Sequence, residues 1–338
     1  MASKYLGCAL VAAALTLASP ASAQSYSNLF VFGDSLVDAG NAQAFRRAVG
    51  GADPAPAAAG YFQGRFSNGY TFADYLGRAV DGGPAVASAY GGRNYSVGGA
   101  QAREMSGDAS PSFAEQIGLY DIGTARFDSQ SLVLITLGGN DIRSQIPSLA
   151  TIPGYVPDFA ATLDAMTAGL TALYARGARN FIVTGLPDIG QIPAVTQLPI
   201  PGLSARVTSL SSGLNDDFEA LVGDFAQSSG SNAQFFDLFD FQNTIYADPA
   251  RFGLPATLDT RRACLQVPGA APSCSGFVYF DVVHPTTQIH RAISRGLTDQ
   301  LGLAAVPEPM TWAMMIVGVA LTGGALRYRR RRTAVAFG

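Results

Sequence analysis

The sequence predicts a doubly wound α/β domain, in which a mostly parallel central sheet lies between two layers of helices. Two observations support this prediction. Short, nearly uninterrupted apolar runs are typical of strands that are buried on both faces of a parallel sheet. They alternate along the chain with longer segments whose apolar residues recur every three or four positions, as on one face of a helix. In such a domain, ligands bind at the carboxyl ends of the strands.

Four apolar runs are expected to form the strands of the sheet: Leu29–Phe32, Ser131–Leu137, Asn180–Gly185 and Ala233–Leu238. Helical spacing of apolar residues predicts helices over Phe159–Leu173 and Val207–Phe225, and a last helix is expected from Pro285 to about Leu301. Two Gly/Pro-rich segments are expected to be long surface loops that shape a binding site: Gly50–Phe72 and Asp81–Ala100.

The first 23 residues have the organisation of a secretory signal peptide. Lys4 supplies a short basic region, "LGCALVAAALTLA" an apolar region, and "ASA" at 21–23 a small-residue cleavage site before Gln24. The apolar region is too short to span a bilayer easily. We therefore expect the protein to be exported and the mature chain to begin at Gln24.

The segment 306–332 combines a Pro-Glu-Pro motif at 307–309, a nearly uninterrupted apolar run and five arginines within six residues. The run is close to the roughly 20 residues of a membrane helix, and we expect a transmembrane segment at 310–328. The arginines then mark the cytoplasmic side, which leaves the chain upstream of them outside. The alternative is a core helix with a basic tail, but such a helix would lack any polar face.

This C-terminal segment resembles a PEP-CTERM sorting signal, because Thr311 and Trp312 follow the Pro-Glu-Pro motif and an apolar span and an arginine cluster come next. The resemblance implies an exosortase-type processing enzyme as a partner and cleavage of the tail. It also implies a protein of the periplasm or cell surface that is attached to the membrane at least transiently. A short tail, 333–338, follows the arginines.

The remaining residues, 24–305, suffice for one large domain. Outside the two terminal segments, 16 of the 22 basic and 24 of the 25 acidic residues remain, which gives a balance near −8. This acidic balance argues against nucleic acid or an anionic membrane surface as a partner. Cys264 and Cys274 form an even pair, which in an exported domain predicts a disulfide; a metal site would need further ligands nearby, and the sequence offers none there.

The motif "FGDS" at 32–35 ends the first expected strand, so Ser35 is expected at the carboxyl edge of the sheet. A serine at this position can simply cap the next helix. Alternatively it is a nucleophile, which requires a base within hydrogen-bond reach and a third group that orients the base.

The chain has two histidines, and both lie in "FDVVHPTTQIH". His284 follows Asp281 by three residues and precedes Pro285, which keeps it out of a helix. The carboxylate can therefore hold the imidazole and fix its tautomer. His290 has no comparable partner and is expected to be a surface or packing residue.

Two glycine-containing motifs offer hydrogen-bond donors for an oxyanion. "LGGND" at 137–141 closes another expected strand, so the amide of Asn140 lies at the same edge of the sheet as Ser35. "NYSVGGA" at 94–100 provides the backbone N–H of Gly99, which no side chain obstructs. Removing one such donor typically costs about 3–4 kcal/mol. Taken singly, each motif is also an ordinary turn or loop.

The motifs "GDS", "GGA", "GGND" and "DVVH" occur in this order and together resemble the four blocks of the GDSL, or SGNH, hydrolase family. "GRFSNGYTFADYL" at 64–76 is similar to a segment of its plant-type and autotransporter-like branch. The resemblance implies an SGNH-hydrolase, flavodoxin-like fold and an esterase or lipase that needs no cofactor. It implies Ser35 as nucleophile, His284 as base and Asp281 as the group that orients it. The oxyanion hole would consist of the Ser35 N–H, Gly99 and Asn140.

Other catalytic signatures are missing from the sequence, which has no Gly-x-Ser-x-Gly elbow, phosphate-binding loop or His-Glu-x-x-His motif. Two histidines also exclude a multi-histidine metal site. We therefore expect an exported serine esterase acting on a lipid, a small ester or an acetylated extracellular polysaccharide. An acyltransferase using the same site is one alternative. A surface-anchored binding protein without turnover is the other.

Overall fold

The computed structural model describes residues 25–104 and 110–303, and its centre is a parallel sheet. Four strands pair in sequence order: β1 (Leu29–Gly33), β2 (Leu132–Thr136), β3 (Asn180–Thr184) and β4 (Asn232–Phe236). Every residue of β1, β2 and β3 is buried, which is why these strands are continuous apolar runs in the sequence. The four predicted strands are confirmed, with ends that differ by one or two residues.

A further stretch of chain, residues 93–97, extends the sheet on the other side of β1. The N–H groups of Tyr95 and Val97 donate to the carbonyls of Val31 and Gly33, at 2.7 and 3.0 Å, in a parallel arrangement. The order along the sheet is therefore 93–97, β1, β2, β3, β4, and it reverses at β1. In doubly wound sheets this reversal opens a crevice at the carboxyl end of the strand. The predicted fold class is thus confirmed, and its crevice lies where β1 ends.

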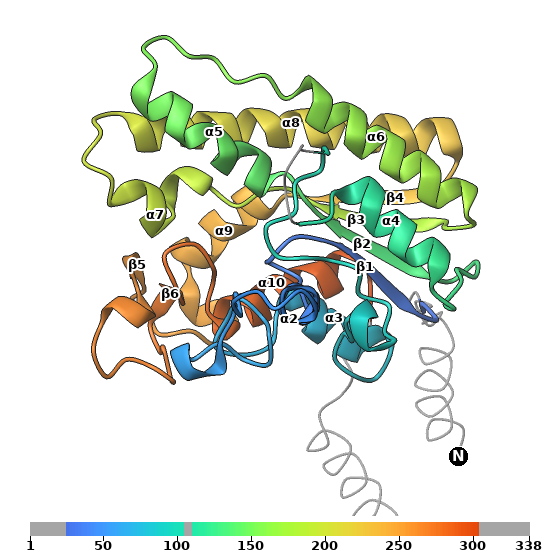
Figure 1. Ribbon diagram of the computed structural model, residues 1–338, viewed down its shortest axis with the longest axis horizontal. Coiled ribbons are helices and arrows are strands. Elements are labelled where there is room, and N and C mark those ends of the chain that lie inside the picture. The colour runs from blue at the N-terminus through green and yellow to red at the C-terminus, as the bar shows by residue number, and fades with distance from the viewer. Residues whose placement is uncertain (1–24, 105–109, 304–338) are drawn as a thin grey trace, which may run out of the picture. The chain divides into compact units, whose positions relative to one another are not determined.

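Helices cover both faces of the sheet (Figure 1). One face carries α2 (Asn41–Ala48), α3 (Phe72–Val80) and α10 (Thr287–Gln300). The other carries α4 (Phe113–Ile122), α5 (Gly139–Thr151), α6 (Ala160–Ala175) and α8 (Leu203–Ser229). Two further helices, α7 (Pro193–Thr196) and α9 (Leu238–Ala247), lie near the carboxyl edge of the sheet. In the described part of the chain, five short 3₁₀ helices complete the helical elements: Ala57–Ala59, Ser88–Tyr90, Ile189–Gln191, Pro249–Phe252 and Cys264–Gln266.

The two helices predicted from apolar spacing are present as α6 and α8, and the last helix, expected from Pro285, is present as α10. The loop expected over Gly50–Phe72 ends at Thr71, because α3 begins at Phe72. Thr71 and Asp74 form a capping box at its N-terminus, and the Asp74 carboxylate also forms a buried ion pair with Arg65 at 2.7 Å. This pair fixes the preceding loop against the helix.

A small second sheet leads into the histidine loop. It pairs β5 (Asp259–Ala263) with β6 (Phe277–Tyr279), and the chain between them contains the disulfide that joins Cys264 to Cys274, with the two Cα atoms 5.4 Å apart. The residues of β6 immediately precede Phe280 and Asp281. The disulfide predicted between Cys264 and Cys274 is therefore confirmed.

The expected signal peptide and the expected sorting signal, with its transmembrane segment, lie outside the described residues. Within the described ranges, 25–104 and 110–303, no helix has the length and apolarity needed to cross a membrane.

Candidate active site

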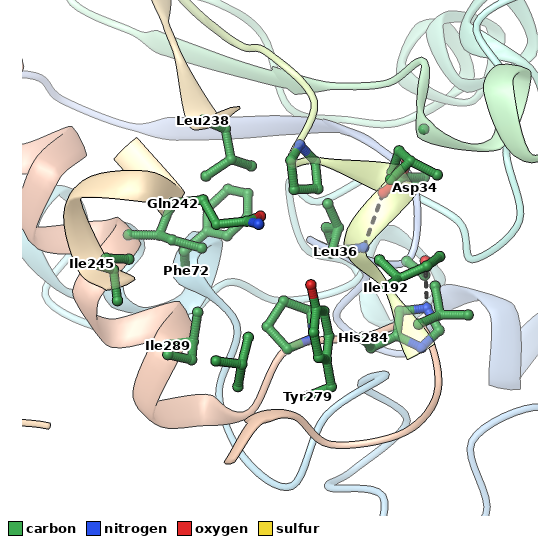
Figure 2. A pocket seen from close by; sticks show the side chains of 18 of the residues that line it. Asp34, Leu36, Phe72, Ile192, Leu238, Gln242, Ile245, Tyr279, His284 and Ile289 are labelled. Atoms are coloured by element: carbon green, nitrogen blue, oxygen red, sulfur yellow. Dashed lines mark hydrogen bonds between the residues drawn. The ribbon is translucent and has the colours of Figure 1, made fainter. Parts of the chain in front are cut away.

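Ser35 lies in a tight turn directly after β1. The ladder between β1 and β2 continues through the Asp34 N–H, which donates to the carbonyl of Thr136 at 3.1 Å. The chain then turns, and Asp34 Oδ1 accepts the N–H of Leu36 at 3.0 Å (Figure 2). Gly33 permits this approach, because a Cβ there would lie 2.6 Å from the Thr136 carbonyl oxygen. The serine thus stands at the carboxyl edge of the sheet, as predicted.

The loop from Asp281 to His284 is held by the carboxylate at its start. Asp281 Oδ1 accepts the backbone N–H groups of Val283 and His284, at 2.8 and 2.7 Å. The Phe280 N–H donates to the His284 carbonyl at 2.7 Å and closes the loop. One short segment therefore fixes both the histidine and the acid beside it.

The two segments meet, although 249 residues separate them in the sequence. His284 Nε2 lies 2.8 Å from Ser35 Oγ, and His284 Nδ1 lies 2.7 Å from Asp281 Oδ2. Because an ionised carboxylate only accepts hydrogen bonds, Nδ1 carries the proton and Nε2 is left to accept the serine O–H. All three side chains are largely shielded from solvent, with Ser35 7% and His284 9% exposed.

Two of the residues predicted to supply oxyanion donors, Ser35 and Asn140, line the same pocket as His284. Within the described residues, the N–H groups of Ser35 and Gly99 donate to no protein acceptor. The side-chain Nδ2 of Asn140 donates one hydrogen to the Ala100 carbonyl at 2.9 Å and has a second hydrogen available. Arg143 donates to Asn140 Oδ1 at 2.9 Å, which fixes the direction in which the amide points. Asn140 stands in the first turn of α5, one strand away from Ser35.

Asp38 ties the turn after Ser35 to the loop that carries Gly99. Its Oδ1 accepts the N–H groups of Gly40 and Asn41, both at 2.7 Å, and begins α2. Its Oδ2 accepts the N–H of Gly98 at 2.8 Å. Gly99 itself has a φ of +91°, a backbone conformation that suits glycine. The buried carboxylate thus positions one of the candidate donors, a role that the sequence analysis missed.

Two aromatic residues of the 50–72 loop also contact the site and were missed. The hydroxyl of Tyr61 donates to Asp281 Oδ2 at 2.8 Å. The ring of Phe66 packs against the His284 imidazole, with ring centres 5.0 Å apart. Phe66 belongs to the "GRFSNGYTFADYL" segment, whereas nothing in the local sequence distinguishes Tyr61 from other loop tyrosines.

Burial and charge set the protonation states around the site. Burial opposes ionisation of Asp281, but the charge and hydrogen bonds of His284 outweigh it and hold the pKa of Asp281 well below its ordinary value. Burial raises the pKa of Asp34 to about 6 in spite of its hydrogen bond from Leu36. Burial raises the pKa of Tyr61, and the charge of Asp281 adds to this, so its hydroxyl remains a donor.

His290 is a packing residue, one of the two roles expected of it. It is 1% exposed, and its Nδ1 accepts the backbone N–H of Phe72 at 3.3 Å. Burial, and to a smaller extent the charge of His284, lowers its pKa to about 3. Elsewhere in the described part of the chain, no group of three or more His, Cys, Asp or Glu side chains is placed to hold a metal ion.

A largely apolar pocket begins beside Ser35 and His284 and extends between α9 and α10. Figure 2 shows its wall, with Leu238 and Ile245 from α9, Ile289 from α10 and Phe72 from α3. Its polar members away from Ser35 are few: Gln242, Tyr246 and Tyr279. A pocket of this kind is suited to the apolar part of an ester.

Comparison with known proteins agrees with this site. The family model described as GDSL-like Lipase/Acylhydrolase matches residues 29–297. A GDSL esterase/lipase of Arabidopsis thaliana is 28% identical, over 78% of this chain and 85% of the plant protein. A phosphatidylcholine-sterol acyltransferase of Aeromonas hydrophila is 24% identical, over 86% of this chain and 95% of that protein. An acetylxylan esterase structure from Geobacillus stearothermophilus aligns with 15% identity and a TM-score of 0.41, covering 83% of this chain and 96% of that one.

The family match is extensive, since it covers residues 29–297. It includes all the motifs that surround Ser35, Asn140 and His284. The chain therefore belongs to the GDSL-like lipase/acylhydrolase family, and it is a hydrolase of carboxylic esters.

Proposed function

We propose that this chain is an exported serine esterase that works through Ser35, His284 and Asp281 and an acyl-enzyme intermediate. The observation that best supports the proposal is the continuous hydrogen-bonded chain from Ser35 Oγ to His284 and on to Asp281, at 2.8 and 2.7 Å. A nucleophile, a base and a group that orients the base are the requirements of this chemistry.

In the first half-reaction, Ser35 Oγ forms a bond to the ester carbonyl carbon while its proton passes to His284 Nε2. The carbonyl π electrons move onto oxygen, which becomes an oxyanion. When the oxyanion re-forms the carbonyl, the bond to the alcohol oxygen breaks, and the alcohol leaves with the proton from Nε2. Asp281, ionised because its pKa is depressed, stabilises the imidazolium between these steps.

In the second half-reaction, a water molecule gives a proton to His284 Nε2 and its oxygen attacks the acyl carbon. The bond from the acyl carbon to Ser35 Oγ then breaks, and Oγ recovers the proton. In both halves the oxyanion is stabilised by the N–H groups of Ser35 and Gly99 and by the amide of Asn140. Two observations support this role: the two N–H groups donate to no acceptor within the described residues, and Asn140 Nδ2 keeps a second hydrogen beside the one it donates to Ala100.

The substrate that we favour is an ester whose acyl chain is longer than acetyl. The apolar pocket next to Ser35 supports this choice, because an acetyl group would leave the side chains along α9 and α10 without contact. A lipid or small ester fits such a pocket better than an acetylated polysaccharide, the third substrate class expected from the sequence.

Export remains part of the proposal. The signal-like segment 1–23 supports it, as does the Cys264–Cys274 disulfide, since disulfides persist mainly outside the cytoplasm. We further propose that the 306–332 segment attaches the protein to the membrane until an exosortase-type enzyme removes it. Mass spectrometry of the mature protein tests this point: a C-terminus that still includes Arg332 would contradict processing.

Transfer of the acyl group to an alcohol is a second candidate activity, favoured by the similarity to a protein named as a phosphatidylcholine-sterol acyltransferase. The same acyl-enzyme serves both reactions, and the acceptor decides between them. Product analysis with a labelled acyl donor, with and without added alcohol, measures the division between free acid and new ester.

Hydrolysis of p-nitrophenyl esters from acetyl to palmitoyl by residues 24–305 tests the main proposal, with the Ser35→Ala variant beside it. We expect activity that rises beyond the acetyl ester and is lost in the variant by at least about 10³-fold. A folded wild-type protein without activity on any ester would instead favour a binding protein that does not turn over.

A further inference from the structure

The pocket beside Ser35 contains one polar group that the fold does not pair. Gln242 lies on α9 and is 8% exposed, and its Nε2 has no hydrogen-bond partner within the described residues. Figure 2 shows its amide pointing into the middle of the pocket, surrounded by Leu238, Ile245 and Phe72. Most buried amides in proteins are hydrogen-bonded, so an unpaired one needs an explanation.

An unpaired buried amide has a cost. Leaving such a donor without an acceptor destabilises a protein by about 1–3 kcal/mol, whereas an apolar side chain of similar shape would not. A substrate with a plain alkyl chain would leave this cost in place, because it would pack over the amide without offering an acceptor for its N–H groups. A substrate with an oxygen at this depth would remove it.

Two hydroxyl groups add to the polar character of the same region. Tyr246 lies one helical turn after Gln242 on α9, and its hydroxyl is 3.4 Å from that of Tyr279. Both tyrosines line the pocket, and the hydroxyl of Tyr279 is directed into it in Figure 2. Burial raises the pKa of Tyr279 to about 12, so the hydroxyl is neutral at ordinary pH and keeps its proton to donate.

We propose that the pocket takes an acyl chain that carries a hydrogen-bond-accepting oxygen, and that Gln242 Nε2 donates to this oxygen. Hydroxy, keto and ether oxygens all qualify. Gln242 is then a specificity-determining residue, in a pocket whose remaining wall is mostly apolar. The inference rests on the proposed function, since it assigns this pocket to the acyl part of the ester.

The test compares octanoyl esters with analogues in which one methylene is replaced by an ether oxygen. The p-nitrophenyl esters of octanoic acid and of its 4-oxa, 5-oxa and 6-oxa analogues have nearly equal length, and each adds only an acceptor. The protein is measured beside Gln242→Met, which keeps the length of the side chain and removes the amide. Intrinsic reactivity of each ester cancels when the ratio of oxa to alkyl kcat/KM is compared between the two proteins.

We expect the ratio for at least one oxa ester to fall roughly 5- to 100-fold in Gln242→Met, as when a site loses the partner of a substrate oxygen. The melting temperature of the variant should not fall, because no hydrogen bond within the protein is lost. Leu238→Met, one turn earlier on the same helix, is the matched control. It should change the rates of all four esters together and leave the ratios within about two-fold.

Calorimetric titration with the corresponding free acids measures the same preference without turnover. If no ester is hydrolysed, the proposed function fails, yet tighter binding of an oxa acid by the wild type than by Gln242→Met would still support the role of the amide. Equal oxa-to-alkyl ratios in wild type and Gln242→Met, in hydrolysis or in binding, would overturn the inference.

Discussion

Asp281 accepts more hydrogen bonds than the one from His284 Nδ1. Besides the His284 ring, it accepts two backbone N–H groups and the hydroxyl of Tyr61. These bonds favour the ionised carboxylate and fix the face that it presents to the imidazole. In the proposed mechanism, Tyr61 therefore acts on Ser35 through Asp281 and His284, as a positioning residue.

Replacing Tyr61 by Phe should lower kcat about 3- to 10-fold with little change in KM. The phenylalanine ring retains the packing on Phe280, whose ring centre lies 5.0 Å away, so only the hydrogen bond to Asp281 is lost. A carboxylate with one donor fewer attracts the imidazolium more strongly, so the acid limb of the kcat/KM profile should move to higher pH. Steady-state kinetics from pH 4 to 9 measure both effects.

Tyr174→Phe is the control, because it removes a hydroxyl that donates to the Ser229 carbonyl far along the chain from the site. An unchanged pH profile in Tyr61→Phe would show that the hydroxyl does not tune the pair.

Loops that follow parallel strands assemble the site, and their placement depends on bonds between them. The turn after β1 and the loop after residues 93–97 are joined by Asp38, which accepts four backbone N–H groups. The long periodic elements α6, α8 and α10 and the buried strands were predictable from the sequence, because each repeats one pattern over many residues. Short helices such as α2 and α3 were not, since their starts depend on single carboxylates, those of Asp38 and Asp74, which accept backbone N–H groups.

Asp38→Asn should disturb both loops, because an amide has a single acceptor oxygen for four donors and adds an NH₂ group among them. We expect the free energy of unfolding to fall by about 2–4 kcal/mol and kcat to fall about 10-fold, as the loop of Gly99 loses its bond from Gly98. Urea unfolding and kinetics on the same preparation measure the two effects. Asp53→Asn, at an exposed carboxylate, is the matched control. A variant as active as wild type would contradict the positioning role of Asp38.

The whole domain brings together residues that no local pattern connects. Ser35, Asp281 and His284 were candidates in advance because four short motifs in a fixed order resemble those of a known family, and the sheet then dictates where strand ends meet. Tyr61 and Gln242 were not, because each is an ordinary residue until tertiary packing places it against the site or the pocket. The sequence therefore predicts the reaction class better than the substrate.

Stability at acid pH should depend on His290, which bridges α10 and the start of α3 as a neutral ring. Its pKa is about 3 in the folded protein, against about 6.5 in an unfolded chain. Because the folded pKa is depressed, the unfolded state binds the proton first, and stability is lost progressively as pH falls from about 6.5 towards 3. The slope cannot exceed about 1.4 kcal/mol per pH unit.

His290→Asn keeps an acceptor near Nδ1 and removes the titration. It should be less stable than wild type at pH 7, because the ring contact with Phe72 is lost, but its stability should fall less between pH 6.5 and 4.5, by roughly 2 kcal/mol. The buried carboxyls of Asp34 and Asp38, whose raised pKa values act in the opposite direction, are common to both proteins and cancel in the difference. Parallel curves for the two proteins in urea unfolding would refute the assignment.

The central claim is that Ser35 is the nucleophile, and covalent trapping tests it most directly. The full domain is incubated with a p-nitrophenyl alkylphosphonate, and its intact mass and peptide map are recorded beside those of His284→Ala. The account predicts one phosphonyl group per chain, on Ser35, with labelling strongly slowed in the variant. An adduct on another residue, or no adduct on a protein that hydrolyses esters, would contradict it.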